Sequence, residues 1–369
     1  MMNISQPAAS QAVAKLARIF GAPLLERIGN AAIATPEGKL VTERARRALM
    51  HLRDPAPVPR GQTRSASDDL LERYSNVTQL RAMALFALTG SLAATAQGLG
   101  QTEASVRRAM KEVAQIIGQP VLRHRNLSPT GARVAARASL ALREIELAHA
   151  ELRERQGIFD SRLIIGALPL ARTQIVPRAV VGLLGKYPSA RLEILDGSYE
   201  FLLQRLRLGA CDVIIGALRN DATDHDLRER RLFTDNLRIV ARAGHPLAGR
   251  KITGADLAAY PWILPRRDAP ARRVFETLAA RHGLATEALG HVETGSLVIL
   301  RGVLFASDAV ALISPSQISF EIDQRLVVSL DIPVEGASRE IGITELAEHM
   351  PSGLHSDFMR FLAQEARNL

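Results

Sequence analysis

Residues 5–27 read SQPAASQAVAKLARIFGAPLLER, and 97 residues later the chain repeats this pattern as TEASVRRAMKEVAQIIGQPVL at residues 102–122. Both stretches then reach a (Thr/Ser)-Pro-x-Gly turn, at residues 35–38 and 128–131, and the second copy gets there four residues sooner. Such a difference fits a hairpin wing of variable length between two fixed elements. The sequence therefore predicts two copies of one structural unit.

Each copy is predicted to contain a helix with defined ends. Ser5 and Thr102 are N-cap residue types, Pro7 fits a first helical turn, and Gly21 and Gly118 fit a helix stop. Apolar residues recur three and four positions apart, which predicts one buried stripe on each helix. The stripe residues are Ala9, Val13, Leu16 and Phe20 in the first copy, and Val106, Ala109, Val113 and Ile116 in the second.

The opposite faces of these helices are polar and basic. They carry Ser10, Gln11, Lys15 and Arg18 in the first copy, and Arg107, Arg108 and Lys111 in the second. A short helix with such residues near its N-terminus has the chemistry to enter a major groove and to contact phosphates.

Only the second copy is preceded by the helices that a helix-turn-helix needs. Residues 79–88 and 92–99 predict two helices around the Thr89-Gly90-Ser91 break, where Ser91 is interpreted as a cap, and Gly100 makes the turn into residues 102–117. With a wing at residues 123–131 this is a winged helix-turn-helix. The equivalent helices of the first copy would need roughly twenty residues ahead of Met1, so either the true start lies upstream or this copy has decayed.

Several of these elements together resemble a known family. The segments S-Q-P-A-x-S at residues 5–10, G-x-P-L-L-x-R at residues 21–27, T-P-x-G at residues 35–38 and Thr89-Gly90-Ser91 are similar to the N-terminal domain of LysR-type transcriptional regulators. The resemblance implies a bacterial protein that binds promoter or operator DNA as a homodimer or homotetramer. It implies DNA contacts from Ser5, Gln6, Pro7, Ser10, Gln11, Lys15, Arg27, Thr102, Ser105, Arg107, Arg108, Lys111 and Arg125.

Which copy reads base edges stays open at this point. The second copy reads Thr102-Glu103-Ala104-Ser105-Val106-Arg107 where the family expects Ser-Gln-Pro-Ala-Val-Ser, and Glu103 would repel phosphate whereas Arg107 and Arg108 would attract it. We favour the first copy for reading sequence. The alternative is that one copy is a structural spacer.

The rest of the N-terminal half is a connector. Residues 54–65 are rich in proline and glycine and indicate a linker, residues 37–52 predict a helix after the first wing, and residues 134–155 predict a longer one. The resemblance implies that this longer helix pairs across a dimer. The expected domains are 1–53, a partial winged helix-turn-helix; 54–77, a linker; 78–133, the second winged helix-turn-helix; 134–160, a linker and dimerisation helix; and 161–369, a two-lobed effector-binding domain.

Charge divides the chain at the same place. Residues 1–162 carry 23 Lys and Arg against 14 Asp and Glu, whereas the remainder carries 24 of each. This asymmetry favours a polyanion-binding half followed by a neutral half with another task, although charge also varies by chance between domains.

The neutral half alternates strands and helices. Strands are expected at 163–167, 191–195, 212–216, 237–242, 262–264, 291–293, 309–313, 326–330 and 340–344, and helices at 173–186, 199–208, 270–282, 296–305 and 355–366. The opening βαβαβ order predicts a parallel sheet. Residues 167–173, 196–199 and 209–219 resemble the α/β, two-lobed, periplasmic-binding-protein-like effector domain of the same family, in the subgroup of galactose-binding-protein and protocatechuate-pathway regulators.

Ligands of such sheets bind beyond the carboxyl ends of the strands. That rule and the resemblance predict an effector pocket lined by Leu168, Pro169, Arg172, Thr173, Ser198, Tyr199, Ala217, Arg219, Leu264, Arg266, Thr294, Ser296 and Ser314. Arg172 and Arg266 favour an organic acid or an acidic sugar, since guanidinium groups pair with carboxylates. The alternative interpretation is that each arginine is only a surface charge and that Ser296 only caps a helix.

Other classes of protein fit less well. No Gly-rich phosphate loop, nucleophile elbow or metal-ligand spacing is present, so we expect no enzyme, no cofactor and no metal site. Cys211, the single cysteine, precedes a strand and is expected in the core. The sequence has no apolar run long enough for a membrane helix and no export signal, which favours a cytoplasmic protein. The remaining alternative is a solute-binding receptor or ligand sensor that does not itself read DNA.

Overall fold

The structure, a computed structural model, describes residues 5–29, 31–53, 70–159, 161–219, 225–285 and 290–368. The chain forms two compact units. The amino-terminal unit comprises Met1–Arg162 with Ser189–Arg191 and Gln204–Ala210, and the carboxyl-terminal unit comprises Leu163–Pro188, Leu192–Leu203 and Cys211–Leu369. Most of the expected linker at residues 54–77 lies outside the described residues. Its last part contains a short helix, α3 (Leu70–Tyr74).

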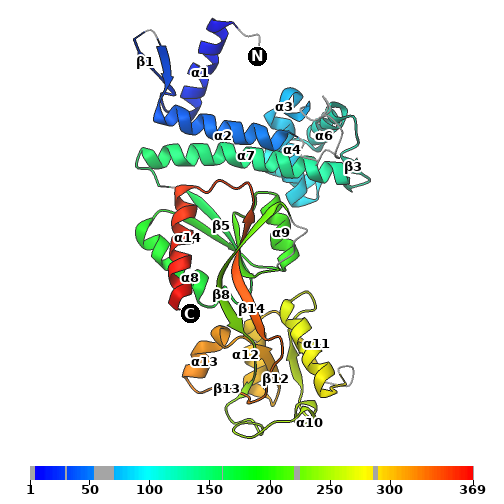
Figure 1. Ribbon diagram of the computed structural model, residues 1–369. Coiled ribbons are helices and arrows are strands. Elements are labelled where there is room, and N and C mark those ends of the chain that lie inside the picture. The colour runs from blue at the N-terminus through cyan, green and yellow to red at the C-terminus, as the bar shows by residue number, and fades with distance from the viewer. Residues whose placement is uncertain are drawn as a thin grey trace, which may run out of the picture. The chain divides into compact units, whose positions relative to one another are not determined.

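The amino-terminal unit is mainly helical and contains two small hairpins (Figure 1). In chain order its remaining elements are α1 (Gln6–Phe20), β1 (Leu25–Ile28), β2 (Ala31–Ala34), α2 (Pro36–Leu52), α4 (Val77–Thr89), α5 (Leu92–Leu99), α6 (Glu103–Ile117), β3 (Leu122–Arg123), β4 (Asn126–Leu127) and α7 (Pro129–Arg155). The duplication is therefore present in the fold, because helix, antiparallel hairpin and helix follow one another twice. α7 begins five residues before the expected start at residue 134.

The same side-chain geometry joins wing and helix in both copies. The Thr35 hydroxyl donates to the Pro23 carbonyl at 2.7 Å and accepts from the Gly38 amide at 2.9 Å. Ser128 makes the equivalent bonds to Pro120 and Gly131, at 2.6 and 2.9 Å. A Cβ on Gly38 would lie 2.0 Å from the Leu24 carbonyl oxygen, so only glycine fits there. The Ser128 cap, followed by a proline at the first helical position, explains the early start of α7.

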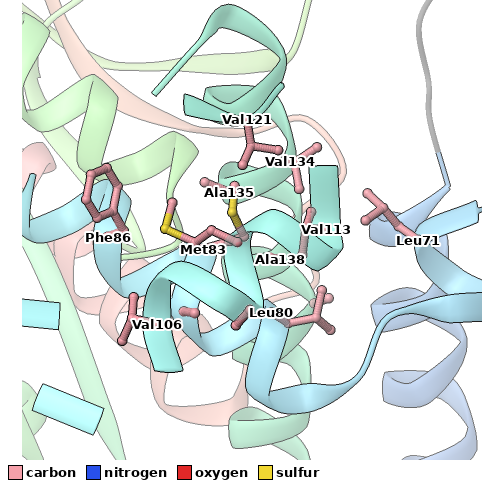
Figure 2. Packing of buried hydrophobic residues seen from close by; sticks show 14 of the residues in the cluster. Leu71, Leu80, Met83, Phe86, Val106, Val113, Val121, Val134, Ala135 and Ala138 are labelled. Carbon is pink, nitrogen blue, oxygen red and sulfur yellow. The ribbon is translucent and has the colours of Figure 1, made fainter. Parts of the chain in front are cut away.

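The second copy has a complete core (Figure 2). The stripe of α6 packs against α4, with Val106 and Val113 fully buried beside Met83 and Phe86. Ser91 caps α5 by accepting from the Ala94 amide. α4, α5, α6 and the β3–β4 hairpin thus occupy the region in which the second winged helix-turn-helix is predicted.

The first copy does not bury its stripe as expected. Phe20 is buried, and stacks on His149 with ring centroids 4.3 Å apart, but Leu16 is exposed and Val13 only half-buried. The prediction of one buried stripe is wrong for Leu16. The reason is physical: α6 is covered by α4 and α5, and no described element takes their place over α1.

α2 and α7 lie side by side in opposite directions (Figure 1). Glu37, at the start of α2, lies near Arg155 at the end of α7, while the carbonyl group of Arg53 after α2 accepts from Arg137 in the first half of α7. Between these ends, the fully buried Arg44 contacts Glu144 at 2.8 Å and also pairs with Glu151.

The carboxyl-terminal unit contains two five-stranded sheets with helices. Its elements are β5 (Arg162–Ala167), α8 (Ile175–Lys186), β6 (Arg191–Leu195), α9 (Tyr199–Arg207), β7 (Val213–Ala217), β8 (Leu227–Asn236), β9 (Arg238–Arg242), α10 (Gly254–Ala258), β10 (Trp262–Leu264), α11 (Pro270–His282), β11 (His291–Glu293), α12 (Leu297–Ala306), β12 (Val310–Ile313), α13 (Ser319–Asp323), β13 (Val327–Ser329), β14 (Ser338–Leu346) and α14 (Gly353–Glu365). All nine expected strands are confirmed. β8 was missed, because four consecutive charged residues, Arg228–Arg231, leave it no continuous apolar run.

The strand orders are β6-β5-β7-β14-β8 in one sheet and β11-β10-β12-β9-β13 in the other. β5 and β7 are parallel, as predicted, and β14 is antiparallel to β7. The chain passes from one sheet to the other between β8 and β9 and returns between β13 and β14. These two crossings lie together, since the Leu237 amide donates to the Ala337 carbonyl at 3.0 Å. The unit is therefore two-lobed. In the described part of the chain, no helix is long and apolar enough to cross a membrane.

We expect the Arg44→Ala variant to lose about 3–5 kcal/mol of unfolding free energy in the amino-terminal unit, because the buried Glu144 and the half-buried Glu151 each lose a guanidinium partner. Urea unfolding followed by helical circular dichroism measures this. Arg46→Ala is the matched control, since Arg46 lies two residues away with its side chain 71% exposed. That variant should lose less than about 1 kcal/mol. Equal losses would contradict the role given to Arg44.

The same helix pair should weaken in acid. Burial favours the neutral form of the Glu144 carboxyl, but hydrogen bonds from His51, Arg44 and Arg47 outweigh it and lower its pKa from 4.5 to about 2. A lowered pKa means that the ionised carboxylate contributes stability above pH 4.5 and that this contribution is lost as pH falls toward 2. Urea titrations between pH 7 and 3 measure how the free energy of unfolding falls with pH. This fall should be smaller in Glu144→Gln than in wild type, and unchanged in Glu146→Gln, whose position is exposed.

Candidate functional site

Every residue predicted to contact DNA is exposed. The exposed set comprises Ser5, Gln6, Pro7, Ser10, Gln11 and Lys15 on or before α1, Arg27 in the first wing, Thr102, Ser105, Arg107, Arg108 and Lys111 on or before α6, and Arg125 in the second wing. The structure places them on two separate helices and two wings, so it forms two candidate DNA-reading surfaces rather than one.

The surface of α6 is organised by its cap. The Thr102 hydroxyl accepts from the Ser105 amide at 3.2 Å and lies 2.9 Å from the Ser105 hydroxyl, which fixes the first turn. Glu103 lies in that first turn, where its carboxylate suits the helix dipole but repels phosphate. Arg107 and Arg108 follow on the exposed side, while the neighbouring Val106 faces the core. This geometry presents cations on a rigid, supported helix.

The surface of α1 is different in chemistry. Ser5 is the N-cap by position, but its hydroxyl makes no capping hydrogen bond within the described residues. Gln6, Ser10 and Gln11 present amide and hydroxyl groups, and the first turn has no acidic residue. Such groups can donate to and accept from base edges. α1 ends at Gly21, whose carbonyl accepts from Gln156 of α7 at 3.2 Å.

A cavity of about 830 Å³ lies within the carboxyl-terminal unit, between the ends of strands from both sheets. This volume suits a small organic molecule. All predicted effector residues except Ser314 line it, including Leu168 and Thr173 after β5, Ser198 and Tyr199 at the start of α9, and Thr294 after β11.

Ser314 lies elsewhere. It is fully buried and donates to Asp235, whose carboxylate also pairs with Arg339 at 2.8 Å. The structure therefore gives Ser314 a place in a polar cluster that joins β12, β8 and β14, where the two sheets are connected. Ser296, which does line the cavity, also caps α12 by accepting from the Ile299 amide at 3.4 Å.

The arginines of the cavity differ in their pairing. Arg172 contacts Asp196 at 3.0 Å and Arg266 contacts Asp268 at 3.3 Å. The two arginines that the sequence favoured for binding a ligand carboxylate therefore already have an acidic neighbour each. The Arg219 guanidinium packs over the Tyr199 ring at 4.5 Å, and no carboxylate of the described residues lies within ion-pair distance of this guanidinium, although the Arg219 backbone amide donates to Glu229 at 3.2 Å. Burial lowers the pKa of its guanidinium, because desolvation disfavours the charged form. An anion beside Arg219 would offset that cost.

Two cavity arginines were missed by the sequence reading. Arg301 on α12 pairs with Glu321, and Arg339 on β14 pairs with Asp235. The alternation of strands and helices gave no signal for them, because they follow no strand end and reach the cavity only through the packing of β14 and α12.

A second polar cluster lies apart from this cavity. His349 Nε2 is 2.9 Å from His355 Nδ1, and His355 Nε2 is 3.1 Å from Glu345 Oε1. These side chains could hold a metal ion, since one ligand atom of each lies within 4.8 Å of the others. Both ring nitrogens of His355 are used in these contacts, so an ion would have to displace one of them. Cys211 is buried, as predicted, and burial raises the pKa of its thiol to about 12.

Comparison with known families gives two matches. The family model described as the LysR substrate binding domain matches residues 157–367, and the bacterial regulatory helix-turn-helix model of the lysR family matches residues 1–39. The first match covers more than half of the chain. The second covers α1 and the first wing, over which the described residues place no counterparts of α4 and α5.

Individual proteins agree with these matches. A "HTH-type transcriptional regulator GalR" of Pseudomonas putida is 31% identical, over 92% of this chain and 85% of its own. A "HTH-type transcriptional regulator PcaQ" of Agrobacterium fabrum is 25% identical, over 76% and 91%. Among solved structures, a full-length OxyR variant from Pseudomonas aeruginosa has a TM-score of 0.58 at 19% identity, covering 80% of this chain and 95% of that one.

Proposed function

The chain belongs to the LysR family of bacterial transcriptional regulators, and from this premise we propose that a small anion in the cavity beside Arg219 controls its binding to operator DNA. DNA binding and the presence of a substrate-binding domain come with the family. What we propose beyond the family is which residues contact DNA and the effector, that the effector is an anion, and that effector binding is coupled to DNA binding.

The proposed DNA contacts are supported by exposure and charge. The two helices, α1 and α6, expose polar and basic side chains near their N-terminal ends, and the wings add Arg27 and Arg125. The basic excess of the whole chain lies in residues 1–162. Cations at these positions neutralise phosphates, and the polar groups of α1 suit base edges.

The proposed effector site is supported by the single observation that Arg219 is a partly buried guanidinium with an aromatic neighbour and no described carboxylate partner. Thr294, Ser198 and Thr173, which carry hydroxyl groups, line the same cavity. A carboxylate binds a guanidinium in a fixed planar geometry, so an organic acid or a sugar acid fits.

We propose that the effector acts on the angle between the two sheets. The cavity is lined from both sheets, and only two adjacent crossings, at residues 236–238 and 330–337, connect them. A ligand that contacts both sides favours the conformation in which both sets of contacts are made. The curated relatives are transcriptional regulators, and we infer a regulatory role without catalysis, in the cytoplasm where the chromosome lies.

We expect Arg107→Ala with Arg108→Ala to weaken binding to the fragment upstream of the gene, and to flatten the slope of log K against log salt by about 0.9 for each phosphate that is no longer neutralised. Fluorescence anisotropy between 50 and 200 mM salt measures this. The charge-matched control replaces Arg178 and Arg238, both exposed on the carboxyl-terminal unit. No binding of wild type to any fragment, or an equal effect of the control, would refute the proposal.

We expect Arg219→Met to weaken binding of the anionic effector by about 10- to 100-fold, since a charged hydrogen bond contributes about 1.5–3 kcal/mol. Thermal shift of the wild type against a panel of carboxylic and sugar acids first identifies a binder, and calorimetry then compares variants. Arg172→Met is the comparison, and should lose less because Asp196 already pairs with it. If Arg172→Met loses more than Arg219→Met, the assignment of the anchor is wrong.

A further inference from the structure

The two winged copies are paired with each other inside one chain. From the (Thr/Ser)-Pro-x-Gly turn onward, each residue of α2 corresponds to the residue 93 positions later in α7, as Pro36 does to Pro129. The two equivalent helices lie antiparallel and in contact. Two copies of one unit in antiparallel contact are related by a two-fold axis, and such an axis makes residues near it meet their own equivalents.

That signature is present at the centre of the pair. His51 of α2 and Glu144 of α7 are equivalent positions, and His51 Nε2 lies 3.7 Å from Glu144 Oε1. Arg44 and Arg137 are also equivalent. Arg44 crosses from α2 to Glu144 and Glu151 of α7, and Arg137 crosses from α7 to the carbonyl groups of His51 and Arg53.

Each of the two cores also contains residues from the helix of the other copy, although these residues are not at equivalent positions. Ala48 and Leu52, in the last part of α2, pack in the core of the second copy. Ala148 and Leu152, in the last part of α7, pack with Phe20, Leu24 and Val41 of the first copy. Each helix therefore begins in its own copy and ends in the core of the other. The face of α7 that carries Ala148 and Leu152 is covered by this same chain.

The reading helices lie at opposite ends of this pair (Figure 1). α7 has 27 residues and so a length of about 40 Å, with the second copy at its start and the first copy at its end. One turn of B-DNA is about 34–36 Å, the spacing at which two-fold proteins place two helices in successive major grooves.

We propose that α1 and α6 of one chain bind together to two adjacent half-sites of one DNA duplex, so that a single chain forms a paired reading unit. The proposal rests on the DNA binding proposed above. Because Gln6 and Ser10 of α1 correspond to Glu103 and Arg107 of α6, the two half-sites are inverted in direction but unequal in sequence. A duplication with identical helices would instead read a palindrome.

Site-directed cleavage tests this in the full-length chain. Arg18 and Gln115 are equivalent, exposed positions in the last turns of α1 and α6, and neither is among the proposed DNA contacts. Each is replaced by cysteine and labelled with an iron chelate that cuts nearby DNA. The DNA is the upstream fragment, or a duplex selected by the chain from a pool with a randomised central region. The two labels are expected to cut at two loci about 10 base pairs apart, each label at one locus.

The unlabelled chain gives the controls and a second measurement. Its only cysteine, Cys211, is buried, so wild type treated with the same reagent should cut nothing. A hydroxyl-radical footprint of wild type should show two protected segments for each bound chain when the chain-to-DNA ratio is measured at saturation.

Other outcomes overturn the inference. Cutting by the Gln115 label alone, or one protected segment for each chain, would mean that the first copy does not touch DNA. Cutting by each label at both loci, with two chains bound, would mean that equivalent helices of different chains form the pair. DNA binding persists in these cases, so the proposed function stands. No retention of any DNA would overturn both.

Discussion

The antiparallel contact of α2 with α7 is the constraint on which the amino-terminal unit depends. Its centre is the buried Arg44 guanidinium, which contacts Glu144 and Glu151 on the neighbouring helix. A charge buried away from water is tolerated only where opposite charges and hydrogen bonds replace its hydration, and the observed register of the two helices satisfies this for Arg44. Apolar packing on both sides, around Ala48 and Leu52 and around Ala148 and Leu152, then holds each winged copy at one end. The separation of α1 and α6 follows from this one helix pair.

In the carboxyl-terminal unit, too, charged side chains around the cavity are paired with opposite charges. Its arginines are mostly held by acidic neighbours, Arg172 by Asp196, Arg266 by Asp268 and Arg339 by Asp235. These pairs shape the walls and reduce their affinity for a further anion. The Arg219 guanidinium packs over Tyr199, and no carboxylate of the described residues pairs with it, which is why we propose this residue as the anchor of an anionic ligand. The arginines of the cavity are chemically alike, so it is their position beside or away from acidic residues that decides which of them is proposed to bind a carboxylate.

Much of this was predictable. The caps, the glycine stops and the apolar spacing located α4, α5 and α6, and nine strands of the carboxyl-terminal unit were placed by their apolar runs. The predicted cavity residues came together because parallel strands bring their carboxyl ends to one edge. The failures have equally physical causes. Leu16 is exposed because burial of a stripe needs a neighbour. β8 contains a run of four charged residues, and Ser314 lies in a polar cluster between the sheets.

The sequence by itself determined the duplication, the family, the order of strands and helices and the basic character of the N-terminal half. These are local or periodic properties, which neighbouring residues encode through backbone preference and the spacing of apolar side chains. Only the tertiary structure decided that α2 pairs with α7 of its own chain, that Arg172 and Arg266 are already paired, and that Arg301 and Arg339 face the cavity. Most of those outcomes depend on contacts between residues far apart in the sequence or on different elements, such as Arg44 with Glu144, where packing and desolvation select one arrangement and no sequence period records it. The exception is Arg266, which pairs with Asp268 in the same loop.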